Sequence, residues 1–421
     1  MSSKGDLHKG GVFMKHLIIG AGAAGITAAK TIRSLRPEDE IMILTEDNHI
    51  VSRVMLHKYI NDERDVESLS FVEEDFLKKN NIQWVGGQKV AHVAPISKTV
   101  MTEESNFSYD KLLIAPGSMS TIPPICILEV VKNLYGFRNL EDAIAIREAA
   151  KTAKKVVVIG AGLVGMAVAE ALLDMGKEVA VVEMGSSILS LNLDEHAAGA
   201  YQSKFEAAGC KFYLGQSVTG TEVDENGNIN VVNLGDGTDL TCDFVVAATG
   251  AKPVVDFLAD SGIEHDRALK VDQHLATNYP DVYGAGDVTG LSGIWPNAMR
   301  QGEIAGKNMA GESVAYEDTF AVKNTVNFYG LVTLTIGALK PEEGDIVEIR
   351  DDSKGYRKLI IRDGRIVGVI LQGDISNSGF WQYLIKHNIQ VEHLNKSIWK
   401  VGFVDFVSFN EEGEYEWHKV M

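Results

Sequence analysis

The chain has few cysteines. Only three of its 421 residues are cysteines, Cys126, Cys210 and Cys242, and they lie far apart. An odd number with no Cys-x-x-Cys pair fits a reducing compartment and the absence of a disulfide framework. The same spacing argues against an iron–sulfur cluster or a structural zinc site, so we expect no metal centre in this chain. We expect all three to be ordinary structural cysteines.

Basic residues are scarce beside acidic ones. Forty Lys and Arg against 58 Asp and Glu give a formal net charge of −18, which argues against nucleic acid or an anionic membrane as partner. No apolar run approaches the roughly 18 residues of a membrane-spanning helix. No signal peptide is visible, and residues 1–13 resemble a loose leader, because the fold signal begins near Met14. We therefore expect a cytoplasmic globular protein.

Glycine is concentrated in two turns. Each follows an apolar run and reads as a strand, a tight turn and a helix start. In such a turn a pyrophosphate rests on backbone N–H groups at the helix N-terminus, where a Cβ would block its approach. The two fingerprints are Gly20-Ala21-Gly22-Ala23-Ala24-Gly25 and Gly160-Ala161-Gly162-Leu163-Val164-Gly165.

Each fingerprint is followed by an acidic residue at the end of a later apolar run. Glu46 lies 21 residues after Gly25, and Glu183 lies 18 residues after Gly165. Both spacings fit a carboxylate that binds ribose hydroxyls. Residues 184–187 include no Lys or Arg to hold a 2′-phosphate, which predicts NADH over NADPH. Two such sites indicate one dinucleotide held permanently and another that exchanges, the layout of a flavin reductase.

A weak internal repeat supports a duplicated domain. The phrases at 112–117 and 245–250 each follow their fingerprint by about ninety residues. The first contains Ala115 and Gly117, and the second ends in Thr249 and Gly250. A nucleotide-binding domain inserted in a second copy of itself would produce this order. We expect helices over 61–80 and 141–152.

A later segment carries a family resemblance. Residues 278–287, which end in Gly284-Ala285-Gly286-Asp287, are similar to the second FAD motif of the pyridine nucleotide–disulfide oxidoreductases. The resemblance implies that Asp287, with Gly286 beside it, binds the flavin ribityl chain. Together with the fingerprints it covers residues 14 to about 310 in family order.

Residues 293–311 are similar to rubredoxin reductases and to the flavoprotein part of NAD(P)H nitrite reductases. The resemblance implies a helix that starts beneath the isoalloxazine ring, with Trp295 and Ala298 close to the flavin. The positive end of that helix would stabilise negative charge on reduced flavin. Trp295 could instead be a packing aromatic.

Residues 52–59 distinguish branches of the family. The disulfide-reductase branches have a redox cysteine here, and this chain has none between Glu46 and Cys126. The segment resembles the Arg-x-x-Leu-Ser-Lys pattern of ferredoxin and rubredoxin reductases, with His57 in place of the serine. This implies that Lys58 lies near flavin N5 and Arg53 near the FAD pyrophosphate or ring.

The roles of Lys58 and His57 stay open. The family often has a glutamate two residues after the second fingerprint to pair with that lysine, but here the position is Ala167 and the next acid is Glu170. Lys58 therefore has another partner, none, or a solvated surface role. His57 is a candidate proton donor, or a histidine that only forms hydrogen bonds.

The expected fold is α/β, with two Rossmann-like dinucleotide-binding domains, one inserted in the other, and a C-terminal α+β domain. We expect an FAD-binding domain at 14–120 and 251–320, an NADH-binding domain at 121–250 and an interface domain at 321–421. The cofactors would be FAD and NADH.

The resemblance implies electron transfer from NADH through FAD to rubredoxin or a similar ferredoxin-like one-electron carrier. Rubredoxins are usually acidic, so docking would need a basic patch near the flavin, from Arg53, Lys58 or Arg300. The alternatives are an NADH oxidase that uses dioxygen and a flavin subunit of a larger complex. A homodimer or a partner subunit would bind through residues 321–421.

Overall fold

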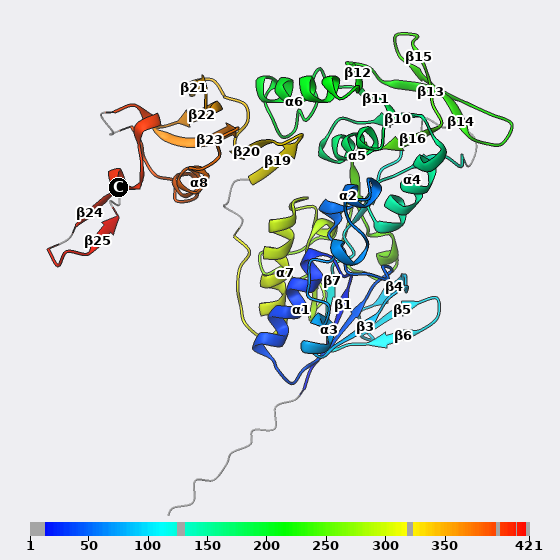
Figure 1. The fold of residues 1–421 in the computed structure, drawn as a ribbon. Coiled ribbons are helices and arrows are strands. Elements are labelled where there is room, and N and C mark those ends of the chain that lie inside the picture. Colours follow the sequence, from blue (N-terminus) through cyan, green and yellow to red (C-terminus); the bar gives the residue numbers. More distant parts are fainter. Residues whose placement is uncertain (1–12, 124–130, 318–322, 393–395, 410, 418–421) are drawn as a thin grey trace, which may run out of the picture. The chain divides into compact units, whose positions relative to one another are not determined.

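The computed structural model describes residues 13–123, 131–317, 323–392, 396–409 and 411–417. The chain forms two compact units, and Figure 1 labels many of their elements. Unit 1 comprises Met1–Thr121, Arg138–Arg147 and Gly250–Glu317, and unit 2 comprises Ile122–Phe137, Glu148–Thr249 and Asp318–Met421. The three domain boundaries expected from the sequence are finer than this division and stay predictions.

Unit 1 is built on a parallel five-stranded sheet in the order β18-β7-β1-β2-β3. Its strands are β1 (Lys15–Ile19), β2 (Glu40–Leu44), β3 (Ile82–Val85), β7 (Lys111–Ile114) and β18 (Val282–Gly284). Leu17 and Ile18 on β1 are both fully buried, as expected of a parallel strand covered on both faces. Two smaller antiparallel sheets contain β4 (Val90–Ala94), β5 (Thr99–Thr102) and β6 (Asn106–Ser108), and β8 (Ser118–Ser120) with β17 (Ala251–Pro253).

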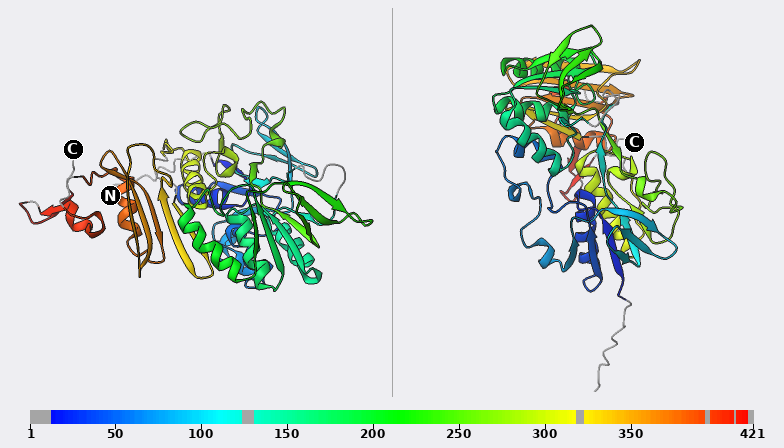
Figure 2. Two further views of the ribbon diagram at one scale, coloured as in Figure 1. Left: turned by 90° about the horizontal axis from the view of Figure 1, so that it is seen from above. Right: turned by 90° about the vertical axis from the view of Figure 1, so that its right-hand side faces the viewer.

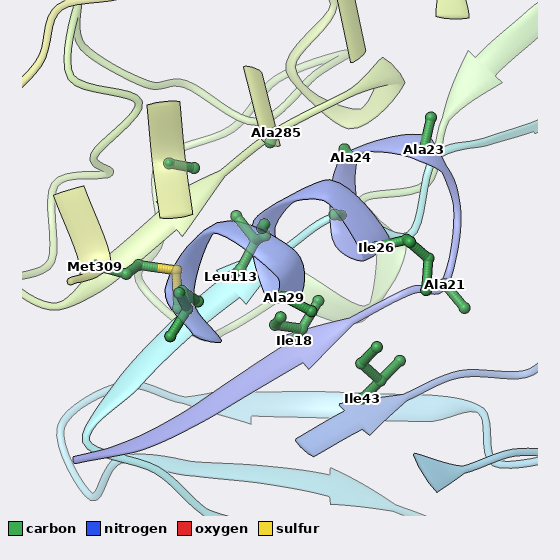
Figure 3. Close-up of a cluster of buried hydrophobic side chains, with 14 of the residues drawn as sticks. Ile18, Ala21, Ala23, Ala24, Ile26, Ala29, Ile43, Leu113, Ala285 and Met309 are labelled. Carbon is green, nitrogen blue, oxygen red and sulfur yellow. The ribbon is translucent and has the colours of Figure 1, made fainter. Parts of the chain in front are cut away.

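Helices α1 (Ala23–Leu35) and α7 (Trp295–Met309) lie side by side in unit 1 (Figure 1). Glycines on α7 permit this close approach, since a Cβ on Gly302 would lie 2.2 Å from the carbonyl oxygen of Ala24. On the side of α1 that faces the sheet, small residues such as Ala29 share a buried cluster with Ile18 and Leu113 of the sheet (Figure 3). The short helices are α2 (His57–Ile60) and α3 (Phe76–Lys79).

The prediction of a helix over 61–80 is wrong for most of that range, because only α3 is α-helical there. Side chains that cap local turns compete with a continuous helix in this acidic stretch. The carboxylate of Asp65, for example, accepts a hydrogen bond from the backbone N–H of Ser68 at 2.9 Å. The helix expected over 141–152 is confirmed as α4 (Leu140–Thr152).

Unit 2 repeats this topology. Its parallel sheet has the order β12-β11-β10-β16-β9, with the fingerprint strand β10 in the centre, as β1 is in unit 1. The strands are β9 (Leu134–Tyr135), β10 (Lys155–Ile159), β11 (Glu178–Glu183), β12 (Lys211–Leu214) and β16 (Phe244–Ala247). A three-stranded antiparallel insert precedes β16, as another precedes β7: β13 (Val218–Val223), β14 (Ile229–Leu234) and β15 (Asp239–Thr241). The expected fold class is confirmed.

The C-terminal part of unit 2 is an antiparallel sheet in the order β19-β20-β23-β22-β21, seen from two further directions in Figure 2. Its strands are β19 (Lys323–Phe328), β20 (Leu331–Gly337), β21 (Ile346–Asp352), β22 (Gly355–Arg362) and β23 (Arg365–Gln372), followed by α8 (Ser378–Lys386), β24 (Val407–Phe409) and β25 (Tyr415–Trp417). α5 (Leu163–Asp174) and α6 (Glu195–Ala207) belong to the preceding βα units.

A buried tyrosine fixes this sheet on α6. The hydroxyl oxygen of Tyr201 lies 2.7 Å from the carbonyl oxygen of Leu331 and 2.9 Å from Oγ1 of Thr333. The ammonium of Lys358 donates to the carboxylate of Asp194, the N-cap of α6, at 3.0 Å.

Across the part of the chain that the structure describes, no helix combines the length and apolarity needed to cross a bilayer.

Candidate dinucleotide-binding sites

The three glycines of the first fingerprint have different roles in the turn between β1 and α1. A Cβ on Gly20 would lie 2.2 Å from the carbonyl oxygen of Ala115, and one on Gly25 would lie 2.0 Å from that of Gly20. Gly22, the N-cap of α1, has nothing within 4 Å of its Cβ position. Packing therefore requires the first and third glycines, and the second faces open space at a helix N-terminus. That space fits the pyrophosphate of a dinucleotide.

The second fingerprint, between β10 and α5, has the same geometry. A Cβ on Gly160 would lie 2.5 Å from the carbonyl oxygen of Ala248, and one on Gly165 would lie 1.9 Å from that of Gly160. Gly162 again caps the helix and has nothing within 4 Å. The chain thus carries two cradles that a Cβ would fill, one in each unit.

The two acidic residues differ in their surroundings. The carboxylate of Glu183 accepts hydrogen bonds from the backbone N–H groups of Ala161 and Gly185, both at 2.8 Å. It is therefore fixed against its glycine-rich turn. The side chain of Glu46 is 70% exposed and lies 4.0 Å from the ammonium of Lys89, so no comparable contact fixes it.

Asp287 is held at the end of β18. Its carboxylate accepts from the hydroxyl of Ser118 at 2.8 Å and forms an ion pair with Arg138. Burial lowers the pKa of the Arg138 guanidinium, an effect that Asp287 opposes, and an arginine remains charged at neutral pH. Sequence reasoning missed Arg138, whose only signal is its place just before α4.

Lys58 has a counterion in its own loop. Its ammonium donates to the carboxylate of Glu63 at 2.7 Å, and this hydrogen bond lowers the pKa of Glu63. Glu170 is buried and accepts from the backbone N–H of Tyr329 at 2.9 Å. The sequence left the partner of Lys58 open, and the structure supplies Glu63, which the family pattern does not mark.

His57 lies next to Lys58 on α2. Burial, followed by the neighbouring ammonium, lowers the pKa of His57 to about 4. The imidazole is therefore neutral near pH 7, which weakens its candidacy as a cationic proton donor. Arg53 donates to Asp47 at 3.2 Å, and its Nη1 lies 3.7 Å from the Cβ position of Gly117. Arg53 therefore lies near the turn after β7.

The remaining candidates lie on helices α1, α5 and α7 and at positions 249 and 250. Trp295 begins α7 and packs edge-on against Phe71, with ring centroids 4.9 Å apart. The next candidate on this helix, Ala298, is buried. Ala23 and Ala24 are buried in the first turn of α1, and Leu163 and Val164 open α5. Thr249 ends a stretch of unit 2 and Gly250 begins a stretch of unit 1.

The flavin candidates fall in unit 1 and the NADH candidates in unit 2, except Gly250, which begins a stretch of unit 1. Gly20, Gly22, Ala23, Ala24, Gly25, Glu46, Arg53, His57, Lys58, Ala115, Gly117, Gly286, Asp287, Trp295 and Ala298 lie in unit 1. Gly160, Gly162, Leu163, Val164, Gly165, Glu183 and Thr249 lie in unit 2. Their functional roles remain predictions.

Two of the three cysteines, Cys210 and Cys242, are described, and both are buried free thiols. Burial raises the pKa of the Cys210 thiol and of the Cys242 thiol to about 12, so both are protonated at neutral pH. Cys126 lies outside the described residues. Among the residues whose placement is described, no group of three His, Cys, Asp or Glu side chains could hold a metal ion.

Comparison with known proteins agrees with this geometry. Residues 14–302 match the family described as pyridine nucleotide-disulphide oxidoreductase, and residues 323–389 match the rubredoxin NAD+ reductase C-terminal domain. The NADH-dependent phenylglyoxylate dehydrogenase subunit epsilon of Aromatoleum evansii is 33% identical over 387 residues, 88% of this chain and 91% of that protein.

Two further relatives cover most of the chain. The NADH-rubredoxin oxidoreductase of Clostridium acetobutylicum is 26% identical over 368 residues, 86% of this chain and 92% of that protein. The crystal structure of a ferredoxin reductase from Rhodopseudomonas palustris has the same fold, with a TM-score of 0.81 at 21% identity over 90% of this chain and 96% of that one.

Proposed function

Because the chain belongs to the pyridine nucleotide–disulphide oxidoreductase family, we propose that it passes electrons from NADH through FAD to a small one-electron carrier such as rubredoxin. That it is an NAD(P)H-dependent flavoprotein oxidoreductase follows from the family and its relatives. The observation that carries the choice of acceptor is the match of residues 323–389 to the rubredoxin reductase C-terminal domain.

FAD would be held in unit 1. The open turn at Gly22 would take its pyrophosphate at the N-terminus of α1. Asp287, fixed by Ser118 and Arg138, would bind the ribityl chain. Trp295 and Ala298 would place the start of α7, with its positive dipole end, beside the ring.

Bound FAD supplies the redox chemistry that no side chain offers, because it accepts a hydride and releases electrons one at a time. The protein contributes charge and position. Lys58 would place a positive charge beside the ring, moderated by Glu63. His57, neutral near pH 7, would add no further charge.

NADH would bind in unit 2, in the open turn at Gly162, with Glu183 directed at the adenosine ribose. No cysteine follows the first fingerprint before Cys126, so no thiol relay stands between flavin and acceptor. The three-domain division at 14–120 with 251–320, 121–250 and 321–421 is part of this proposal, as are carrier or subunit contacts through the last domain.

The test is NADH consumption by the purified yellow protein, first in air and then anaerobically with added rubredoxin. We expect slow turnover in air and a large gain with rubredoxin. Fast turnover in air with little gain from rubredoxin would identify an NADH oxidase and reject the proposal.

A flavin subunit of a larger complex is the second candidate. The specific observation in its favour is the 33% identity to a protein named as the epsilon subunit of a dehydrogenase. Slow turnover under both conditions, while NADH still bleaches the flavin, would favour this candidate. Co-purification with an iron–sulfur subunit would then distinguish it from a stand-alone reductase.

A further inference from the structure

One fully buried polar side chain on α7 has no part in the function proposed above. Gln301 is 0% exposed. Its Oε1 accepts a hydrogen bond from the backbone N–H of Gly286 at 2.7 Å and another from the hydroxyl of Thr289 at 3.2 Å. Its Nε2 is buried and has no hydrogen-bond partner among the described residues.

Both partners of Gln301 belong to the turn that carries Asp287. Gly286 has a φ of +83°, a conformation that favours glycine, and the next three residues, Asp287–Thr289, form a single 3₁₀ turn. The two hydrogen bonds that Gln301 accepts therefore come from the two ends of this turn. The carboxylate of Asp287 is held independently by Ser118 and Arg138.

Gln301 also stands where three elements meet closely. A Cβ on Gly286 would lie 3.1 Å from the Cβ of Ala24 on α1 and 3.9 Å from that of Ala298 on α7. A Cβ on Gly302, the next residue after Gln301, would lie 2.2 Å from the carbonyl oxygen of Ala24. Figure 3 shows Ala24 and Ala285 at this junction of α1 with the sheet.

We propose that Gln301 is a positioning residue for FAD. It locks the Asp287 turn against α1 and α7, so that the predicted pyrophosphate, ribityl and ring contacts keep one mutual geometry. The inference rests on the proposed function, because it takes Asp287 as a flavin ligand. Gln301 itself acts through the turn.

The chemistry of the site favours this role over simple packing. Burying an amide donor without a partner costs free energy, and an apolar side chain of similar size would avoid that cost. The glutamine oxygen accepts from the backbone N–H of Gly286, which would otherwise be left buried and unpaired, whereas the hydroxyl of Thr289 also donates to the carbonyl oxygen of Gly286 at 2.8 Å. Loss of the Gln301 side-chain oxygen should therefore weaken the Asp287 turn, and with it FAD binding, more than it lowers the stability of the whole protein.

The experiment measures release of FAD from the holoenzyme after dilution, by the rise in FAD fluorescence, together with the melting temperature. Gln301→Met removes the amide and keeps the side-chain length, and Gln301→Leu is the alternative if that variant does not fold. Gln301→Glu keeps oxygen acceptors. Asn308→Leu is the matched control, since Asn308 is a buried carboxamide on the same helix that bonds Val314 and His274.

We expect Gln301→Met to release FAD at least tenfold faster than wild type, and Gln301→Glu to stay within threefold. Asn308→Leu should melt at a lower temperature while its FAD release stays within threefold. Release from Gln301→Met within threefold of wild type, or release from Gln301→Glu as fast as from Gln301→Met, overturns the inference.

Asp287→Ala separates failure of this inference from failure of the proposed function. Fast release from Asp287→Ala with wild-type release from Gln301→Met overturns the role of Gln301 alone. Wild-type release from Asp287→Ala overturns the flavin assignment of Asp287, and the role of Gln301 with it.

Discussion

At the residue scale, Gly22 and Gly25 lie three positions apart in one fingerprint and differ in what a methyl group would meet. A Cβ on Gly22 meets nothing within 4 Å, and one on Gly25 meets a carbonyl oxygen at 2.0 Å. We expect Gly22→Ala to fold normally and to lose FAD, because the methyl group occupies the pyrophosphate space. Flavin content after purification, with circular dichroism for the fold, measures this.

Gly25→Ala is the contrasting variant, expected to fail in folding because backbone would have to move. Gly162→Ala should retain FAD and bind NADH more weakly, since its open turn lies in unit 2. Full flavin content in Gly22→Ala would contradict the assignment of the first fingerprint to FAD.

Glu183 is expected to determine the preference for NADH. A charge-assisted hydrogen bond contributes about 1.5–3 kcal/mol, so Glu183→Ala should raise the KM for NADH by about 10- to 100-fold. The KM for NADPH should fall, because no carboxylate then repels the 2′-phosphate. Steady-state kinetics with both cofactors measure this. Glu178→Ala, at the other end of β11, controls for loss of a carboxylate.

His57 makes stability depend on pH. Its pKa is lowered to about 4 in the folded chain and is about 6.5 when unfolded. Between these values the unfolded state binds the extra proton, so stability is full above about pH 6.5 and falls toward pH 4. We expect the difference in melting temperature between pH 7.5 and pH 5.0 to shrink in His57→Gln. The lowered pKa of His57 would be contradicted if His57→Gln left the difference in melting temperature unchanged. It would also be contradicted if His92→Gln reduced that difference equally.

At the element scale, the crossing of α1 and α7 depends on glycine. Gly302→Ala would place a methyl group 2.2 Å from the carbonyl oxygen of Ala24, and overpacking of this kind costs about 1–3 kcal/mol. We expect a lower melting temperature. Gly199→Ala on α6, where nothing lies within 4 Å, should instead stabilise the protein by up to about 1 kcal/mol. Equal effects from the two substitutions would contradict this packing account.

Elements with local signals were predictable and those set by tertiary contacts were not. The two strand–turn–helix units are visible in the sequence because glycine spacing and apolar runs are local properties. The helix expected over 61–80 is mostly absent, since turn-capping side chains such as Asp65 compete with it. Arg138 and Gln301 could not be found this way, because what marks them is a contact with residues distant in sequence or a buried position.

At the scale of the whole molecule, the duplication explains the order of the chain. Both parallel sheets place the fingerprint strand in the centre and receive a strand after a three-stranded insert. The outer strand β18 comes from far along the chain, whereas β9 precedes its own fingerprint strand. The C-terminal sheet has no such signal, and its attachment through Tyr201 depends on contacts that no local pattern indicates.

Charge at this scale bears on the acceptor. The three cations expected to form a basic patch each have an acidic partner: Arg53 pairs with Asp47, Lys58 with Glu63 and Arg300 with Glu303. The positive patch that an acidic carrier would need is therefore largely neutralised, and the net charge of −18 sets the long-range field. That field should repel an acidic carrier during encounter.

We therefore expect turnover with rubredoxin, at carrier concentrations below KM, to rise severalfold as salt increases from 0.01 to 0.15 M. The Debye length falls from about 30 Å to about 8 Å over this range, which screens the repulsion between the two acidic proteins. Reduction of the flavin by NADH, measured by stopped flow without carrier, serves as the control for effects of salt on the enzyme. A fall in turnover with salt would show that a local positive surface overrides the net charge, and Arg53→Gln should then weaken carrier binding further.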